Sequence, residues 1–400
     1  MEPNENEPKK QAPWAPPKPE FPAPTPERYA AAPLLPTPNE IIAMLDKKVV
    51  GQIEAKRTLA VAAYSHFLNC ALGELSNYPV EPTSVLLIGP TGSGKSFLLK
   101  SLRECLMKIP MVYVSCTNLT QNGYKGVNVN EILDRLENEL LEDNRTQPAI
   151  VVWDEVDKLR ELPSTHPVIT CGVQQDLLTY LDGTLCGKSG LLDSSRILNV
   201  ACGAFVGLDK LRKRQNSAPR IGFVDSLHAA AHAESEETVE PLSTRHLIDY
   251  GFIPEFVGRF GAITELTRLD AVTLRKILTE AEGNPLAVKK RMYEIHGIEL
   301  RVTDCALDEL IARAEKMETG ARSLKRVIHA TLGRYDRRLP EMAARGVTTL
   351  TVTAETIRGE KPAIQTTAIV PKNLPLLLEL RKRAGAYAHW KKKPKEESVW

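Results

Sequence analysis

The sequence contains no long apolar run and no large excess of charge of either sign. Its 400 residues carry 52 Lys and Arg against 50 Asp and Glu, a net charge of +2. This balance gives no general reason to expect a nucleic acid as the main partner. No stretch approaches the ~20 apolar residues that span a bilayer, so we expect no membrane association. The first ten residues are acidic and lack an apolar segment, which argues against a secretory signal or a transit peptide.

Cysteine is sparse and its spacing is irregular. The seven cysteines are odd in number and include no C-x-x-C pair. This pattern predicts neither a disulfide framework nor a zinc site. It fits a chain that works in the reducing cytoplasm.

Composition divides the chain into four segments. Twelve of the 28 prolines lie between Pro3 and Pro38, and such a segment prefers extended, solvated conformations. We therefore expect residues 1–37 to form a disordered arm, either a plain linker or one anchored to a partner through Trp14 and Phe21. The other three segments are a large domain over 38–268, a small α+β domain over 269–365 and a C-terminal extension over 366–400. That extension ends in a basic run, which is more typical of a solvated tail than of a nucleic-acid contact.

Short, continuously apolar runs alternate with helical periodicity in the large domain. This alternation predicts an α/β fold with a parallel sheet covered by helices on both faces. Residues 206–245 show little periodicity, so we expect a long functional or disordered loop there. The expected strands are 84–88, 111–114, 149–153 and 197–201.

A phosphate-binding loop follows the first strand directly and opens a helix. Glycines let successive backbone N–H groups point at phosphates, and the helix N-terminus adds positive potential. Lys95 is placed for the β- and γ-phosphates, and the Ser96 hydroxyl for Mg²⁺. The alternative is a glycine-rich turn with a chance Lys-Ser pair. The loop consists of Gly89, Pro90, Thr91, Gly92, Ser93, Gly94, Lys95 and Ser96.

Two carboxylates, Asp154 and Glu155, end the strand 149–153. The carboxyl ends of parallel strands form the crevice in which α/β proteins bind ligands. We expect Asp154 to hold Mg²⁺ through its water shell, and Glu155 to orient and polarise the attacking water. The alternative is a solvated strand end.

Seven short blocks, taken in order, resemble the ATPase module of the ClpX family over residues 36–360, with HslU as a more distant relative. The blocks are Pro36-Thr37-Pro38 to Leu45-Asp46, Val50-Gly51-Gln52, Ala55-Lys56, Asp154-Glu155-Val156-Asp157-Lys158, Gly203-Ala204-Phe205, Phe252 to Arg259, and Thr319-Gly320-Ala321-Arg322.

The resemblance implies an AAA+ domain and a lid domain with ATP bound between them, assembled as a homohexamer. Val50 and Gly51 would approach the adenine. Arg259 would be the arginine finger that reaches a neighbouring subunit's γ-phosphate, and Arg322 the sensor-2 arginine. Alone, either arginine would more often be a surface ion pair.

Two further segments match the family only in context. Tyr124, within Gly123-Tyr124-Lys125-Gly126, would be the pore-loop aromatic that grips substrate, with Lys125 replacing the usual valine. Outside the family context this segment would be an exposed turn. Ile221, Gly222 and Phe223 match the tripeptide that docks on a ClpP-type peptidase, or else they fasten a loop to its own domain.

Several features depart from the family. The amino-terminal zinc-binding domain is absent, and the segment between Thr184 and Arg196 lacks the basic pore-entrance loop. At the sensor-1 position the chain has Ala201 and Cys202, with Asn199 two residues earlier, and the sequence leaves open which of these, if either, senses phosphate. The sequence thus predicts an ATP-dependent unfoldase acting on protein substrates. The alternatives are a protease-independent remodelling factor and a scaffold or DNA-associated switch, although no helix-turn-helix appendage is apparent.

Overall fold

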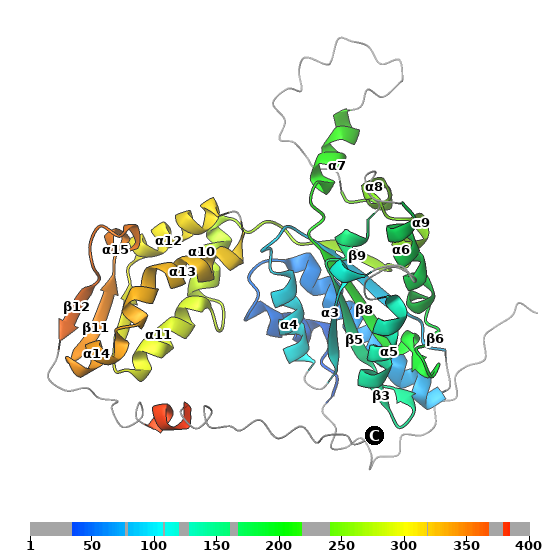
Figure 1. The fold of residues 1–400 in the computed structure, drawn as a ribbon, viewed down its shortest axis with the longest axis horizontal. Helices are drawn as coiled ribbons and strands as arrows, with labels where there is room; N and C mark the ends of the chain where they lie inside the picture. Colours follow the sequence, from blue (N-terminus) through cyan, green and yellow to red (C-terminus); the bar gives the residue numbers. More distant parts are fainter. Residues whose placement is uncertain are drawn as a thin grey trace, which may run out of the picture.

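The computed structural model describes residues 34–76, 79–106, 109–119, 128–160, 167–217, 241–317, 319–367 and 379–384. These residues form two bodies that lie side by side and are joined by the segment after the strand β9 (Figure 1). No helix in these ranges is long and apolar enough to cross a bilayer.

The larger body is built on a five-stranded sheet in the order β2-β5-β8-β1-β9. Every neighbouring pair in this sheet is parallel. This confirms the predicted α/β fold with a parallel sheet, and it adds a short edge strand, β9, that the sequence did not reveal. The strands are β1 (Thr83–Ile88), β2 (Met111–Ser115), β5 (Ala149–Asp154), β8 (Ile197–Gly203) and β9 (Ala262–Glu265).

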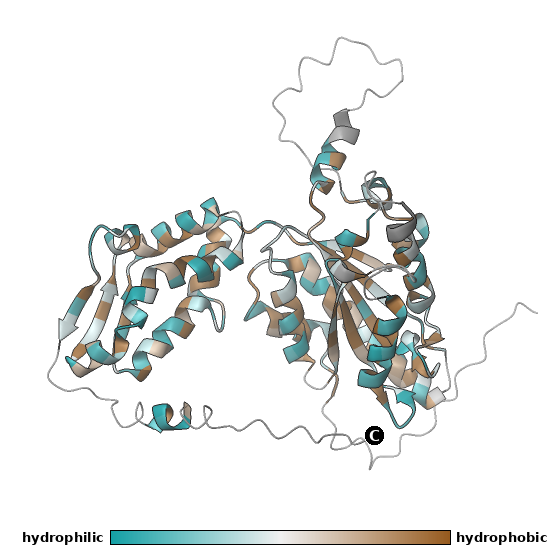
Figure 2. Cartoon of the chain, viewed as in Figure 1, coloured by the Kyte–Doolittle hydropathy of each residue, from teal (hydrophilic) through white to brown (hydrophobic). Residues whose placement is uncertain are grey.

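Both faces of the central strands β1, β5 and β8 are buried, which explains why these strands are mainly apolar (Figure 2). Because successive side chains point to opposite faces, Leu86 and Val151 belong to one core while Val85 and Ile150 belong to the other. The first face is covered by α5 (Val129–Leu140), α6 (Pro167–Leu181), α8 (Thr244–Tyr250) and α9 (Pro254–Val257), and the second by α2 (Pro38–Asp46), α3 (Ile53–Ser76) and α4 (Lys95–Cys105).

The expectation of a loop throughout 206–245 is wrong at both ends. Helix α7 (Leu208–Ser217) rises from the top of the sheet in Figure 1, and α8 begins at Thr244. The sequence of α7 is strongly polar. Leu208 and Leu211 pack against the core. Arg212, which is 5% exposed, adds an ion pair in which its Nη1 donates to Glu265 Oε1 at 2.7 Å. Two leucines in a polar helix give too little apolar periodicity to detect. Residues 218–240 lie outside the described ranges.

Two short hairpins decorate the larger body, formed by β3 (Leu141–Glu142) with β4 (Arg145–Thr146), and by β6 (Leu185–Cys186) with β7 (Leu192–Asp193). The tip of the second hairpin is fixed to α5. The buried carboxylate of Glu137 accepts from Ser189 N at 3.0 Å, Ser189 Oγ at 2.5 Å and Leu191 N at 3.2 Å. The segment that replaces the family's basic loop is therefore a closed hairpin.

The smaller body has its own core, which extends from Leu269 to Ala363. Its sheet pairs β10 with β11 in parallel and β11 with β12 antiparallel. Strand β12 was not predicted, because all four of its residues are exposed and carry no apolar pattern. The elements are α10 (Ala271–Thr279), α11 (Pro285–Ile295), β10 (Glu299–Val302), α12 (Asp304–Lys316), α13 (Ala321–Asp336), α14 (Leu339–Ala344), β11 (Val347–Val352), α15 (Ala354–Arg358) and β12 (Ile364–Thr367).

Candidate nucleotide-binding site

The loop between β1 and α4 has the backbone shape that phosphate binding requires. Gly92 and Gly94 have φ values of 83° and 101°, which glycine adopts without steric cost. Gly94 is the N-cap of α4 and supplies no side-chain cap, so the first-turn N–H groups remain available to an anion. Ser93 is 3% exposed, and its Oγ has no hydrogen-bond partner. The loop therefore presents unsatisfied polar atoms around a cradle that phosphate oxygens would fill.

Lys95 lies at the centre of this cradle. Its Nζ contacts the carbonyl oxygens of Gly89 and, at 3.1 Å, Pro90. Burial lowers the pKa of Lys95, opposed by the negative charges of Asp157 and Asp154. A desolvated ammonium of this kind gains by acquiring an anionic ligand.

The two acids lie at the carboxyl edge of the sheet. The register of β2, β5 and β8 places Ser115, Asp154 and Cys202 in one row. Glu155 has a φ of 59°, a left-handed conformation that costs a non-glycine residue about 1–2 kcal/mol. Its N–H donates to Asp154 Oδ1 at 2.9 Å. This strained turn directs the Glu155 side chain away from the path of the strand, as is typical of functional sites.

A third polar residue, Thr117, contacts Glu155, and the sequence analysis missed it. Thr117 lies in the short helix η1 (Cys116–Asn118), which directly follows β2. Its hydroxyl donates to Glu155 Oε2 and lies 3.2 Å from Ser115 Oγ. The available signal was the pair of hydroxyl residues, Ser115 and Thr117, that follow the predicted strand 111–114.

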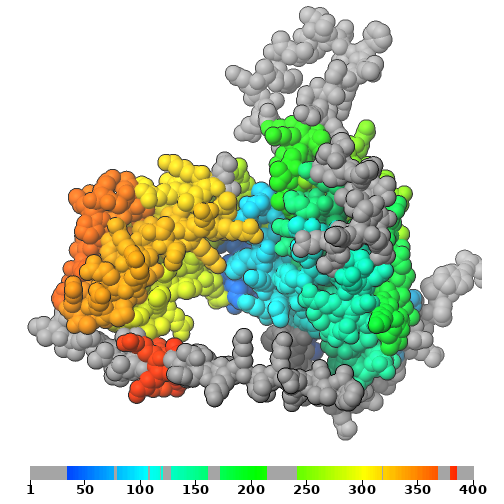
Figure 3. Space-filling view, viewed as in Figure 1, coloured from blue at the N-terminus to red at the C-terminus, as the bar shows by residue number. Residues whose placement is uncertain are grey.

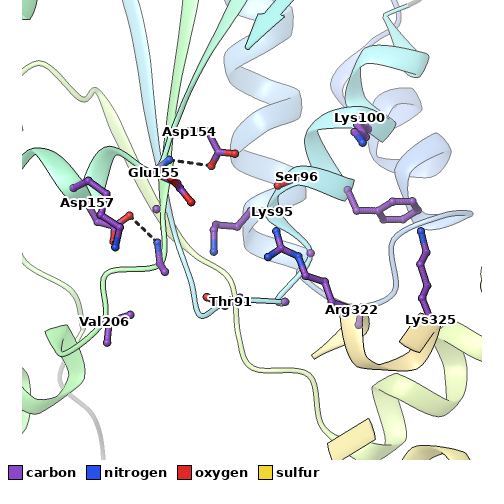
Figure 4. A pocket seen from close by; sticks show the side chains of 17 residues that line it. Thr91, Lys95, Ser96, Lys100, Asp154, Glu155, Asp157, Val206, Arg322 and Lys325 are labelled. Atoms are coloured by element: carbon purple, nitrogen blue, oxygen red, sulfur yellow. Dashed lines mark hydrogen bonds and ion pairs between the residues drawn. The ribbon is translucent and has the colours of Figure 1, made fainter. Parts of the chain in front are cut away.

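The phosphate-binding loop, with Lys95, and the two acids line one cavity of about 450 Å³, shown in Figure 4. The phosphate-binding loop supplies its floor, and the acids face Lys95 across it. The small domain contributes Arg322 and Lys325 from the first turns of α13. The site therefore holds five cationic side chains beside three carboxylates, an excess of positive charge that fits a triphosphate accompanied by Mg²⁺. The lining residues include Thr91, Gly92, Gly94, Lys95, Ser96, Lys100, Asp154, Glu155, Asp157, Lys158, Arg322 and Lys325.

The small domain touches the phosphate-binding loop backbone to backbone. The Ala321 N–H donates to Gly92 O at 3.1 Å. A Cβ on Gly92 would lie 2.0 Å from Thr319 O, and one on Gly320 would lie 2.4 Å from Gly92 O. Both glycines are thus required for the approach that brings Arg322 to the cavity. The space-filling view shows the two bodies meeting at this seam (Figure 3).

Gln52 joins three segments behind the cavity. The residue is 8% exposed, and its Nε2 donates to Thr267 O at 2.9 Å and Ser93 O at 3.3 Å. Its Oε1 accepts from Thr267 N at 2.9 Å. The turn that contains Val50 and Gly51 is thereby fixed beside the phosphate-binding loop. Neither Val50 nor Gly51 lines the cavity of Figure 4, so their contact with adenine stays a prediction.

Arg259 does not line this cavity either. It follows α9 and pairs with Asp182 at the end of α6. Tyr124 and the tripeptide Ile221, Gly222 and Phe223 lie outside the described residues.

The structure separates the two sensor-1 candidates. Asn199 is fully buried, and its Oδ1 accepts from the indole N–H of Trp153 at 3.0 Å, so it serves the core. Cys202 instead places Sγ 3.2 Å from Asp154 Oδ1. Burial and the nearby carboxylate raise the pKa of the Cys202 thiol. The Cys202 thiol therefore lies beside Asp154 at the end of β8.

Comparison with known proteins assigns both bodies. The model of the AAA domain (Cdc48 subfamily) matches residues 81–263, and that of the C-terminal D2-small domain of ClpB protein matches residues 269–335. Together with the cavity between them, these matches define an AAA+ ATPase. The ATP-dependent Clp protease ATP-binding subunit ClpX of Azotobacter vinelandii is 37% identical over 331 residues, which cover 75% of this chain and 74% of that protein. The chain belongs to the ClpX family.

Proposed function

We propose that this ATPase uses Mg²⁺ and ATP to unfold protein substrates, working as a ring of six. In this proposal residues 38–268 form the ATPase domain, and residues 269–365 form a lid that closes on the nucleotide. The contacts between Gly92, Gly320 and Ala321 support it, because they connect the phosphate-binding loop directly to the lid. A change in the phosphates can thus move one domain against the other.

Within each subunit we assign four roles. Lys95 and Arg322 balance the phosphate charge, and Ser96 and Asp154 bind Mg²⁺, which neutralises charge on the phosphoryl oxygens. Glu155, oriented by Thr117, polarises the attacking water. Arg259 acts on the nucleotide of the neighbouring subunit.

The observation that carries the proposal is the position of Arg259. The residue lies outside the cavity of its own subunit, and its side chain is 40% exposed. If Arg259 acts on a nucleotide, this position places its guanidinium at a site on another chain. We expect Arg259→Ala to lower ATPase activity by about 10³-fold or more, the range of arginine fingers, with the ring still assembled. Full activity in that variant would remove the finger and with it the need for a ring.

Two contacts with other proteins rest on the family resemblance alone. Tyr124 would grip the substrate in the central pore, and Ile221, Gly222 and Phe223 would dock on a ClpP-type peptidase. Mixing the chain with such a peptidase, ATP and a tagged folded substrate should give ATP-dependent proteolysis. Deleting residues 221–223 should abolish proteolysis and preserve unfolding.

One observation favours a second candidate, a remodelling factor that works without a peptidase on a dedicated substrate. The hairpin of β6 and β7 is tied to Glu137 and carries no basic pore-entrance loop. Recognition of general degradation tags would then be lost. Unfolding of a native partner, with no degradation when the peptidase is added, is the result that distinguishes this function.

A further inference from the structure

Arg259 is held by a carboxylate of its own chain. Its Nε contacts Asp182 Oδ1, and its Nη2 donates to Asp182 Oδ2 at 3.0 Å. This side-on fork occupies one edge of the guanidinium. Among the described residues, Nη1 has no hydrogen bond or ion pair. The pair is 40% and 39% exposed, so the remaining N–H groups are accessible to a ligand from outside the subunit.

The place of Asp182 in the fold is unusual for an acidic residue. It directly follows α6, and its N–H continues the helical pattern by donating to Leu178 O at 2.9 Å. A carboxylate at a helix C-terminus faces the negative end of the macrodipole, where cations are favoured instead. The carboxylate of Asp182 therefore adds to the negative charge at the C-terminal end of α6, and the guanidinium of Arg259 neutralises this charge.

Helix α6 also fixes the backbone around Arg259. Gln174 of α6 is fully buried, and its Oε1 accepts from Ile253 N at 2.9 Å at the start of α9. Phe256 and Phe260, which flank Arg259, line one small apolar cavity with Leu177 and Leu181 of α6. Burial of these neighbours thus fixes the backbone at Arg259, and the conformation of its long side chain is what Asp182 can still determine.

We propose that Asp182 is a positioning residue for Arg259, which it orients in advance so that the free edge of the guanidinium meets a neighbouring subunit's γ-phosphate. The inference deepens the proposed function, because it requires Arg259 to be the finger. Preorganised donors cost no reorganisation when charge develops in the transition state. Asp182 supplies this preorganisation from the finger's own chain, away from the site where hydrolysis takes place.

The first test is the ATPase activity of Asp182→Asn in the full-length chain. Asparagine keeps the size of the side chain and is tolerated at helix ends, but it cannot accept the same pair of charge-assisted bonds. We expect kcat to fall about tenfold, which is about 1.4 kcal/mol and comparable to the rotamer entropy of one long side chain. KM for ATP and ring assembly should not change, since Asp182 touches no nucleotide. Asp182→Glu should restore most of kcat, because it keeps the carboxylate.

A matched control is Asp308→Asn, which removes a carboxylate from the ion pair with Arg275 on the small domain. We expect wild-type kcat there. Equal losses in both variants would mean that kcat follows total charge, which overturns the inference.

Mixed rings test the direction of the effect. Arg259→Ala subunits lack the finger, and Glu155→Gln subunits lack the water-polarising acid. Mixing them should restore ATPase activity at sites where an Arg259→Ala subunit supplies Glu155 and a neighbouring Glu155→Gln subunit supplies Arg259. Adding Asp182→Asn to the Glu155→Gln subunit, which donates the finger, should lower the restored activity about tenfold. Adding it to the Arg259→Ala subunit should have no effect. A loss of similar size from either subunit would overturn the inference in favour of a general structural role.

The failure of the inference is distinguishable from that of the proposed function. An inactive Arg259→Ala with a fully active Asp182→Asn contradicts only the role of Asp182. A fully active Arg259→Ala contradicts the finger itself. Should Asp182→Asn fail to assemble, Asp182→Ser in the mixed rings provides the same comparison, with the same expected and contradicting results.

Discussion

The two sides of the nucleotide cavity are built in different ways. The side formed by the large domain follows from the sheet, since the register of β1, β5 and β8 places the phosphate-binding loop and both acids at one edge. The side formed by the small domain, with Arg322 and Lys325, depends on the seam between Gly92 and Gly320 and on Gln52 behind it. One side is fixed by a buried core, and the other is attached through a few backbone contacts.

In the proposed function, this difference separates the groups that hydrolyse ATP from those that couple hydrolysis to movement of the small domain. In the proposed function, the group that must act on a single atom, Glu155, lies on the side formed by the large domain, where its backbone conformation and hydrogen bonds define its position. Groups that respond to the state of the nucleotide lie on the side that can be displaced at small cost. Substitutions on the first side should therefore abolish turnover, and those on the second should weaken nucleotide affinity and its link to unfolding.

Among the residues that line the cavity, the largest effect is expected from Glu155→Gln. The amide keeps the shape of the side chain but cannot polarise water, so kcat should fall about 10²–10⁴-fold, as for loss of a general base. ATP affinity, measured by equilibrium binding, should stay close to wild type. Normal steady-state turnover in this variant would show that Glu155 does not have this role.

Arg322→Ala tests the contribution of the small domain to nucleotide binding. Loss of one charged hydrogen-bonding group should cost about 1.5–3 kcal/mol of binding, so the Kd for ATP should rise roughly 10–100-fold. Lys316→Ala, an exposed substitution elsewhere on the same domain, serves as the control. Unchanged ATP affinity would place Arg322 outside the site.

Gly320→Ala tests the seam itself. An added Cβ would collide with Gly92 O, and the backbone of Gly320 (φ 52°, ψ −135°) lies in a region that side chains rarely adopt, which adds about 1–3 kcal/mol of strain. The small domain should shift, and ATP affinity should fall about tenfold while the large domain keeps its melting temperature. Gly333→Ala, whose Cβ would meet nothing within 4 Å, should leave affinity intact.

Gln52→Met should give the smallest effect of this series. It removes the amide that pairs with both the N–H and C=O of Thr267, at about 0.5–1.5 kcal/mol for each hydrogen bond. We expect a rise of a few-fold to about tenfold in KM for ATP, with a larger drop in unfolding per ATP hydrolysed. A proportional loss of both activities would argue against a coupling role.

Sequence patterns predicted the parallel sheet and located the phosphate-binding loop and the acids, because buried strands and phosphate cradles have strict local requirements. Patterns did not reveal the contacts of Thr117, Gln52 or Asp182, because the partners of these residues are distant along the chain. Thr117 meets Glu155 across two strands, and Gln52 meets Thr267 215 residues away. Helix α7 was missed because two leucines in a polar helix give too little apolar periodicity to detect.

The most direct measurement is an experimental structure of the Glu155→Gln variant with ATP and Mg²⁺. The account predicts one nucleotide in the cavity of Figure 4, with Mg²⁺ about 2.0–2.1 Å from Ser96 Oγ and Asp154 in its water shell. Lys95 and Arg322 should contact the same triphosphate from opposite domains. A nucleotide bound elsewhere, or a metal site that excludes Ser96 and Asp154, would contradict the central claim that the two sides form one catalytic site.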